Sequence, residues 1–229
     1  MPPKRRLYLV ELFSGSHSVS KALTEFLTDT FEIRVLSVDS DPKTNASVVA
    51  DINRWNYKRD INEFLRSQRA NDIVFVHASP PCTAFSRANT IGIRDIEGGN
   101  RNVKRALKII KHVDPHIWTL ENPVGLLKEQ PFMRKLNKYM NTTCYCKFGK
   151  PFKKPTNIWT NVKDLDLPMC TSQTPCPHKA THGHHSHTAQ SGDTSNGKSI
   201  GSGGGRHVYP LPAALVRYVY SKGLAQLRR

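Results

Sequence analysis

Acidic side chains are scarce in this chain of 229 residues. It holds 18 Asp and Glu against 34 Lys and Arg, which gives a formal net charge of +16. That balance is unusual for an enzyme acting on small molecules. It suits a polyanionic partner, because each neutralised phosphate releases condensed counterions. The charge therefore predicts a nucleic-acid partner, and the alternative is a protein that is merely basic and sticky.

Long apolar runs are also missing. No window holds 18 consecutive apolar residues, and the opening "MPPKRR" is not followed by the apolar core of a signal peptide. The five cysteines are an odd number without the spacing of a disulfide scaffold, which indicates a reducing compartment. We therefore expect a soluble intracellular protein that has no contact with a membrane.

Strand-like and helix-like segments alternate over most of the chain. Strands are expected over residues 6–13, 31–39, 72–79, 115–122 and 155–162. Helices are expected over residues 18–27 and 60–68 and along the apolar stripe Val103, Ala106, Leu107 and Ile110. The alternation predicts an α/β fold of the Rossmann-like type, a mostly parallel sheet with helices on both faces.

Polar or reactive residues lie where the expected strands end: Gly15, Asp39, Asp51, Cys82 and Glu121. Ligands of open parallel sheets bind at this edge. Asp39 could accept both hydroxyls of a ribose, and Asp51 is placed for an adenine amino group. Gly15 would let a polar group approach the backbone amides of a helix start, although a plain tight turn explains it about as well.

The segment "SPPC" (79–82) puts a thiol directly after two prolines at a strand end. Pro80 and Pro81 restrict the backbone, so the sulfur of Cys82 is aimed with little loss of conformational freedom. Cysteine combines high nucleophilicity with an accessible thiolate. We interpret Cys82 as a nucleophile, and the alternative is a small buried apolar residue.

Read in order, "LFSGS", "VDSDP", "ADI", "SPPCTAFS", "LENP", "FGKPFKKPTNIW" and "RHVYPLPAAL" resemble the motifs of the cytosine carbon-5 DNA methyltransferase family. The similarity is to its compact viral, phage or mobile-element members. A viral member would act in the nucleus or cytoplasm of a host cell. The resemblance implies S-adenosylmethionine as methyl donor, DNA as substrate and extrusion of the target base from the duplex. A monomer is expected.

The resemblance also assigns roles to residues. Those expected to bind the cofactor are Phe13, Ser14, Gly15, Ser16, Asp39, Ser40, Asp51, Ile52 and Pro80. The catalytic set is Cys82, Glu121 and Lys154. The set expected on the substrate side is Pro81, Ser86, Asn122, Lys153 and Thr156, where Asn122 could instead shape the turn that follows its strand.

The chain departs from the family pattern at three places. His17 follows a first loop with fewer glycines, "ENP" replaces Glu-Asn-Val, and Lys154 and Thr156 stand where the family has two arginines. Lysine keeps the charge but not the bidentate fork. Two alternatives therefore stay open: methylation of RNA cytosine, and a catalytically silent nucleic-acid-binding protein of the same fold.

Three regions are expected: a catalytic core over residues 1–162, a small insert over 163–205 in place of a target-recognition domain, and a C-terminal helix over 206–229 that completes the core. In that helix Leu211, Leu215 and Tyr218 share one face. So short an insert can read few base edges. The neighbouring lysines are expected to contact phosphate: Lys147, Lys150, Lys153 and Lys154.

The insert carries "CTSQTPCPHKATHGHHSH" (170–187), a segment dense in potential zinc ligands. Four thiolate and imidazole groups satisfy a structural zinc ion. The expected ligands are Cys170, Cys176, His178 and His182, with His184 as a further candidate. The alternative is a flexible polar loop with incidental histidines. Cys144 and Cys146 are expected to alternate along a strand and to serve as core.

Overall fold

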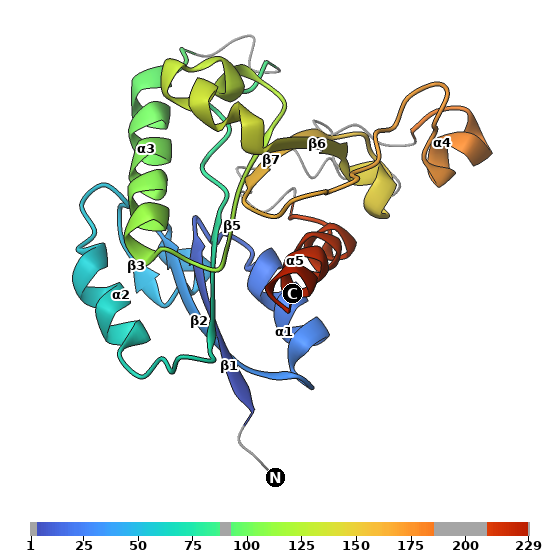
Figure 1. The fold of residues 1–229 in the computed structure, drawn as a ribbon. Coiled ribbons are helices and arrows are strands. Elements are labelled where there is room, and N and C mark those ends of the chain that lie inside the picture. The colour runs from blue at the N-terminus through green and yellow to red at the C-terminus, as the bar shows by residue number, and fades with distance from the viewer. Residues whose placement is uncertain (1–3, 88–92, 186–209, 229) are drawn as a thin grey trace.

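The structure, a computed structural model, describes residues 4–87, 93–185 and 210–228 (Figure 1). In these ranges seven strands form one sheet in the order β3-β2-β1-β4-β5-β7-β6. The strands are β1 (Arg5–Leu12), β2 (Phe31–Asp39), β3 (Val48–Val49), β4 (Ile73–Ala78), β5 (Ile117–Pro123), β6 (Met140–Cys144) and β7 (Pro155–Thr160). Strands β1 to β5 pair in parallel, and β7 runs antiparallel to both β5 and β6. The predicted fold class is confirmed.

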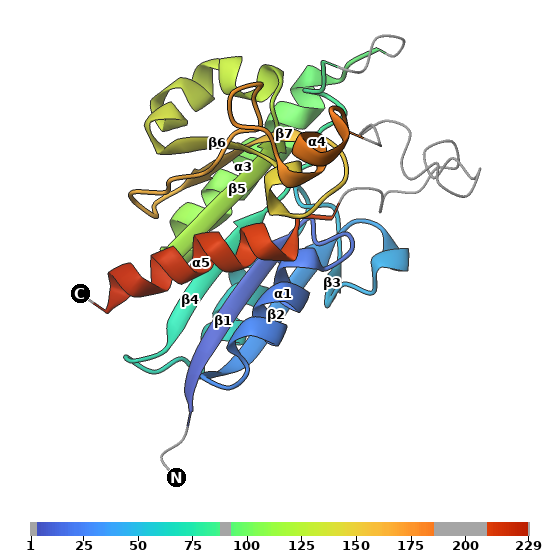
Figure 2. The same cartoon turned by 90° about the vertical axis from the view of Figure 1, so that its right-hand side faces the viewer.

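Helices cover both faces of the sheet (Figures 1 and 2). Helices α2 (Tyr57–Leu65) and α3 (Ile96–Val113) lie on one face, and α1 (Ser18–Leu27) and α5 (Ala213–Leu227) lie on the other. Alternation along β1 explains this arrangement. Val10 and Leu12 pack in the core beneath α2 and α3, whereas Leu7 and Leu9 pack in the core beneath α1 and α5.

Short helices join these elements. Four are 3₁₀ helices: η1 (Pro42–Thr44), η2 (Leu126–Glu129), η3 (Pro131–Tyr139) and η4 (Tyr145–Phe148). A fifth, α4 (Pro177–His182), lies in the region after β7. None of the helices in the described part of the chain is long and apolar enough to cross a membrane.

A buried acid holds the start of α1. His17 precedes the helix in a left-handed conformation, and its side chain makes no capping bond. Instead the carboxylate of Glu11, in β1, accepts hydrogen bonds from the backbone N–H groups of Val19 (3.1 Å) and Ser20 (3.3 Å). Burial raises the pKa of Glu11, while these donors oppose the rise. The contact fixes where α1 begins relative to the first loop.

The loop of residues 80–86 follows β4 and is held between two glycines. Its turn is closed by the carbonyl of Cys82, which accepts from the N–H groups of Phe85 (2.9 Å) and Ser86 (2.8 Å). A Cβ at Gly99 of α3 would lie 2.6 Å from the Cβ of Ala84. A Cβ at Gly125 would overlap the carbonyl oxygen of Phe85. Only glycine lets α3 and the turn after β5 approach the loop this closely.

Gly125→Ala is therefore expected to lower the free energy of unfolding by about 1–3 kcal/mol, because the loop backbone must shift to make room. Urea unfolding followed by circular dichroism measures the change. Lys135→Ala, at an exposed position of η3, serves as control and is expected to stay within about 0.5 kcal/mol of the parent. An unchanged urea midpoint for Gly125→Ala would show that the approach is not tight.

Candidate active site

A cavity of about 250 Å³ opens at the carboxyl ends of the strands. Its lining follows β1, β2, β3 and β4 in turn, and β1 and β4 flank the point where the strand order reverses. Five residues predicted to bind the cofactor line it: Phe13, Asp39, Ser40, Asp51 and Ile52. Pro81, expected on the substrate side, lines it too.

The turn between β1 and α1 is fastened to the end of β2. One carboxylate oxygen of Asp39 accepts the N–H of Gly15 (2.9 Å), and the other accepts the N–H of Asp41 (2.9 Å). Gly15 has φ +46°, a conformation that favours glycine. Each oxygen keeps a lone pair for a further donor. Asp39 therefore shapes the turn while it lines the cavity.

The other predicted cofactor residues lie in loops beside this cavity. Ser14 and Ser16 flank Gly15, and the hydroxyl of Ser14 is buried without a hydrogen-bond partner among the residues that the structure describes. Pro80 lies in the 80–86 loop. The ring of His17 contacts the carbonyl of Thr44 (2.7 Å) and lines a separate surface hollow beside α1, so it does not crowd the cavity.

A second cavity of about 630 Å³ adjoins the first, because Asp51, Pro81 and Asn102 line both. Its wall also includes Thr83 and Ala84 of the 80–86 loop. Cavities of about 300–1,000 Å³ are the usual size for small-molecule sites. Because Pro81 lines both openings, ligand-sized space lies beside the 80–86 loop.

Cys82 is half-buried, and its thiol lies within electrostatic reach of two predicted catalytic residues. Burial raises the pKa of Cys82, the charge of Lys154 lowers it, and the charge of Glu121 raises it. The structure thus brings Cys82, Glu121 and Lys154 to one place from the end of β4, from β5 and from the residue before β7. The thiol is not sealed in the interior.

The carboxylate of Glu121 is buried and receives three hydroxyl groups. Ser79 donates to its Oε2 (3.2 Å), and Tyr145 donates to its Oε1 (3.2 Å). Thr156 makes a short hydrogen bond to the same Oε1. The Nζ of Lys154 lies 4.5 Å from the centre of the Tyr145 ring. Buried charge is tolerated where it is hydrogen-bonded in this way.

Ser79 belongs to a chain of buried polar groups that the sequence did not reveal. The His77 ring contacts Ser79 Oγ through Nε2 (2.8 Å) and Thr119 Oγ1 through Nδ1 (2.7 Å), and Thr119 contacts the hydroxyl of Tyr220 in α5 (2.8 Å). Burial lowers the pKa of His77 to about 3, so the ring is neutral. Only the short "HAS" run before the prolines could have pointed to it.

Two residues predicted on the substrate side make supporting hydrogen bonds. Asn122 is buried, and its amide donates to the carbonyl of Pro80 (2.8 Å), which holds the 80–86 loop against β5. Thr156 is also buried, and besides Glu121 it binds the carbonyl of Asn122 (3.1 Å). Ser86 closes the loop turn through its backbone, and Lys153 is exposed.

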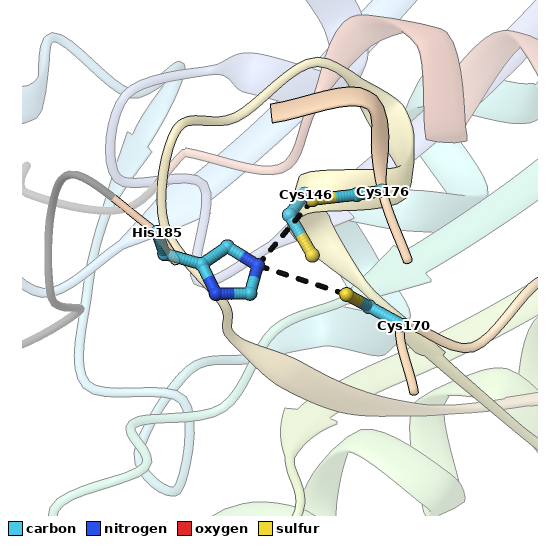
Figure 3. Close-up of side chains that lie close together, drawn as sticks. All are labelled: Cys146, Cys170, Cys176 and His185. Carbon is cyan, nitrogen blue, oxygen red and sulfur yellow. Dashed lines mark hydrogen bonds between the residues drawn. The ribbon is translucent and has the colours of Figure 1, made fainter. Parts of the chain in front are cut away.

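A second group of reactive side chains lies beyond the sheet edge (Figure 3). It joins Cys146, Cys170, Cys176 and His185, whose ligand atoms all lie within 4.8 Å of one another. Two of the expected metal ligands, Cys170 and Cys176, are in it. Cys146 was expected on a strand as core, but β6 ends at Cys144 and η4 turns the sulfur of Cys146 into the group.

The predicted ligands His178 and His182 are not in this group. They lie four residues apart on α4, and their rings contact each other with centroids 4.9 Å apart. That spacing puts both rings on one helix face, while Cys176, at the N-cap, faces the other sulfurs. His184 is exposed, and His187 lies outside the described residues.

An open α/β sheet with a cavity at its switch point, bordered by an acid at the end of β2, is the arrangement of S-adenosylmethionine-dependent methyltransferases. The model of the family described as C-5 cytosine-specific DNA methylase matches residues 7–146. The chain belongs to this family of DNA cytosine-5 methyltransferases, as the motifs predicted. Membership implies S-adenosylmethionine as cofactor and DNA as substrate.

Two similar proteins place the chain among known sequences and structures. A Frog virus 3 (isolate Goorha) protein named "Probable DNA (cytosine-5)-methyltransferase" is 29% identical over 183 residues, which cover 74% of this chain and 77% of that protein. The structure of the Entamoeba histolytica methyltransferase EhMeth matches at 15% identity and a TM-score of 0.47. That match covers 73% of this chain and spans 58% of the length of EhMeth.

Lys154→Gln is expected to raise the pKa of Cys82, because it removes the positive charge that favours the thiolate. Alkylation by iodoacetamide follows the thiolate, so its pH profile should move toward higher pH. Mass spectrometry of the Cys82 peptide measures it. Lys153→Gln, at the exposed neighbour, should leave the profile unchanged. Identical pH profiles in both variants would show that Lys154 does not favour the thiolate of Cys82.

Proposed function

We propose that the protein transfers a methyl group from S-adenosylmethionine to carbon 5 of cytosine in DNA, through a covalent adduct between the base and Cys82. The observation that carries this proposal is the meeting of three side chains, Cys82, Glu121 and Lys154, beside the cavity at the switch point. Their proximity gives a nucleophile, an acid and a cation to one reacting ring.

The described residues fit the cofactor. Asp39 keeps free lone pairs at the cavity wall for ribose hydroxyls, and Asp51 offers an acceptor for an adenine amino group. Phe13 and Ile52 give the same cavity an apolar wall. Ser14, Gly15, Ser16, Ser40 and Pro80 complete the proposed binding set. When bound, S-adenosylmethionine supplies an electrophilic methyl group.

Cys82 acts first. Carbon 5 of cytosine is a poor nucleophile, so the thiolate adds to carbon 6 and breaks the aromaticity of the ring. Carbon 5 then has enamine character and can accept a methyl group. Lys154 favours the thiolate that starts the sequence. After methylation a base removes the proton on carbon 5, the bond from sulfur to carbon 6 breaks with release of the Cys82 thiolate, and the proton on ring nitrogen 3 returns to Glu121.

Glu121 stabilises the adduct by holding a proton at ring nitrogen 3, a general-acid role. Its hydrogen bonds are matched to both protonation states. With Glu121 ionised, Ser79 donates to it and accepts from the Nε2–H of His77, whose Nδ1 accepts from Thr119. With a proton on Oε2, the same chain reverses its direction through the other tautomer of the neutral ring. The His77 ring stays neutral in both states, so Ser79, His77 and Thr119 carry no charge.

The substrate side is proposed to comprise Pro81, Ser86, Asn122, Lys153 and Thr156. Lys153 is exposed and can contact phosphate, whereas Asn122 and Thr156 act through the supporting bonds described above. A carbon stacked inside a duplex is out of reach of Cys82, so the target base must be extruded. We propose a monomer, with residues 163–205 as a minimal insert beside the 1–162 core and the C-terminal region 206–229, whose described part contains α5.

A DNA oligonucleotide that contains 5-fluorocytosine is expected to form a stable covalent adduct with the protein in the presence of S-adenosylmethionine. Fluorine replaces the carbon-5 proton, so the base cannot remove that proton and Cys82 is not released. Denaturing gel electrophoresis and mass spectrometry detect the adduct at Cys82. Cys82→Ser abolishes it, and Cys144→Ser, at a buried cysteine outside the site, keeps it. Glu121→Gln slows formation by about 10²–10⁴-fold.

The same assay separates the competing functions. An adduct on RNA but not on DNA would show that the substrate is RNA. Binding of DNA without an adduct on any cytosine-containing strand would instead indicate a catalytically silent binding protein.

Asp51→Ala is expected to weaken binding of S-adenosylmethionine by about 10–100-fold, because a hydrogen bond to a charged acceptor is worth about 1.5–3 kcal/mol. Isothermal titration calorimetry without DNA measures the affinity. Asp29→Ala, at an exposed acid outside the cavity, is the matched control. Equal affinities for Asp51→Ala and the parent would place the adenine elsewhere.

A further inference from the structure

The cluster of Cys146, Cys170, Cys176 and His185 takes its members from two parts of the chain. Cys146 comes from η4, between β6 and β7, and the other three come from the region after β7. Cys146, Cys170 and Cys176 are buried, and His185 closes the group on its open side (Figure 3). The cluster is separate from the 80–86 loop and from both cavities described above.

The spacing of the donor atoms is that of a metal tetrahedron. A zinc ion bound at about 2.3 Å from sulfur and about 2.1 Å from nitrogen, with tetrahedral angles, separates S and N ligands by about 3.6 Å. His185 Nε2 lies 3.7 Å from the sulfur of Cys170 and 3.4 Å from the sulfur of Cys176. Three sulfurs and one imidazole nitrogen form one of the standard ligand sets for structural zinc.

The surrounding chain depends on the cluster for its packing. Between residues 163 and 185, Cys170 and Cys176 are the only side chains that are fully buried. No residue of α4 is buried. Leu165 and Leu167 pack against the core beside α5, but residues 168–185 bury no apolar side chain other than the two cysteines. A stretch with so little core gains most from a covalent or metal cross-link. Four thiols and the thioether of Met169 supply little stability themselves.

Neighbouring groups compensate the charge of bound thiolates. The backbone N–H of Lys179 donates to the sulfur of Cys176 (3.3 Å), a bond typical of the outer shell of a metal site. Lys147 is held at the same place by its bond to the carbonyl of Pro175 (2.9 Å). Three thiolates and one zinc ion leave a net charge of −1, which the ammonium of Lys147 offsets.

We propose that Cys146, Cys170, Cys176 and His185 bind one structural zinc ion that joins the region after β7 to the sheet. The site also braces the active site. Cys146 follows Tyr145, which is fully buried, donates to Glu121 and lies beneath Lys154. Zinc therefore fixes the backbone that carries Tyr145, and Tyr145 is a positioning residue for Glu121. The metal site itself stands independently of the proposed methyl transfer.

The full-length protein, purified under reducing conditions without chelators, is expected to contain one zinc ion per chain by elemental mass spectrometry. Exchange with Co²⁺ should give the thiolate-to-cobalt charge-transfer absorption and the visible bands of a tetrahedral site. Cys170→Ser and His185→Ala are expected to lose most of the metal. Cys144→Ser and His182→Ala keep it, because these residues are near the cluster but outside the ligand set.

Three results would contradict the proposed zinc site, each in a different way. Absence of zinc together with failure to bind Co²⁺ after reduction overturns the site, even if the ligand variants do not fold. Retention of full zinc by His185→Ala but not by His182→Ala overturns the ligand set. A disulfide among the cysteines, shown by fewer than five iodoacetamide-labelled thiols in the denatured, unreduced chain, replaces the metal by an oxidised cross-link.

The effect of zinc on the active site is tested by a separate measurement. Removal of zinc by a chelator is expected to lower the rate of adduct formation at Cys82 and to leave binding of S-adenosylmethionine within about twofold, because the cavity at β1 to β4 lies apart from η4. Loss of both together would indicate general unfolding and would overturn the positioning role of the metal. A zinc-loaded protein without any adduct would refute the proposed function and leave the metal site intact.

Discussion

The hydrogen bonding of one buried carboxylate organises the half of the molecule that lies beyond the parallel strands. A charge at the position of Glu121 requires donors, and the chain supplies them from three directions: Ser79 after β4, Tyr145 in η4 and Thr156 in β7. The antiparallel pairing of β7 with β5 and β6 is what brings the last two into reach. The sheet edge and the site therefore form one unit.

The order of the sheet explains why the cofactor cavity and the thiol share a border. β1 and β4 are neighbours although the chain between them visits β2 and β3. The turn after β1 and the 80–86 loop after β4 consequently face each other across the switch point, and Asp39 and Asn122 fasten one each. Two glycines, one on α3 and one after β5, leave just enough room for the loop between them.

Local patterns in the sequence predicted much of this. The strands with alternating or continuous apolar residues were predicted, and so were the polar residues at their ends. Strand ends and the proline pair are local signals that a sequence shows directly. β3 has only two residues and was not expected. The strand expected through Cys144 and Cys146 was misplaced, because β6 ("MNTTC") has no apolar alternation and ends at Cys144. The chain from His77 to Tyr220 was missed because it joins residues up to 101 positions apart. The members of the cluster beside α4 were half found, Cys170 and Cys176 but not Cys146 and His185, since spacing cannot tell which side of α4 faces the sulfurs.

The position of Tyr220 late in the sequence has a consequence for folding during synthesis. Its hydroxyl comes from α5, far along the chain, yet it ends the hydrogen-bond chain that reaches Glu121 through β4 and β5. During synthesis on the ribosome the sheet strands emerge well before this helix does. The hydrogen-bond chain that starts at Tyr220 is therefore complete only after α5 has been made and has docked against the sheet.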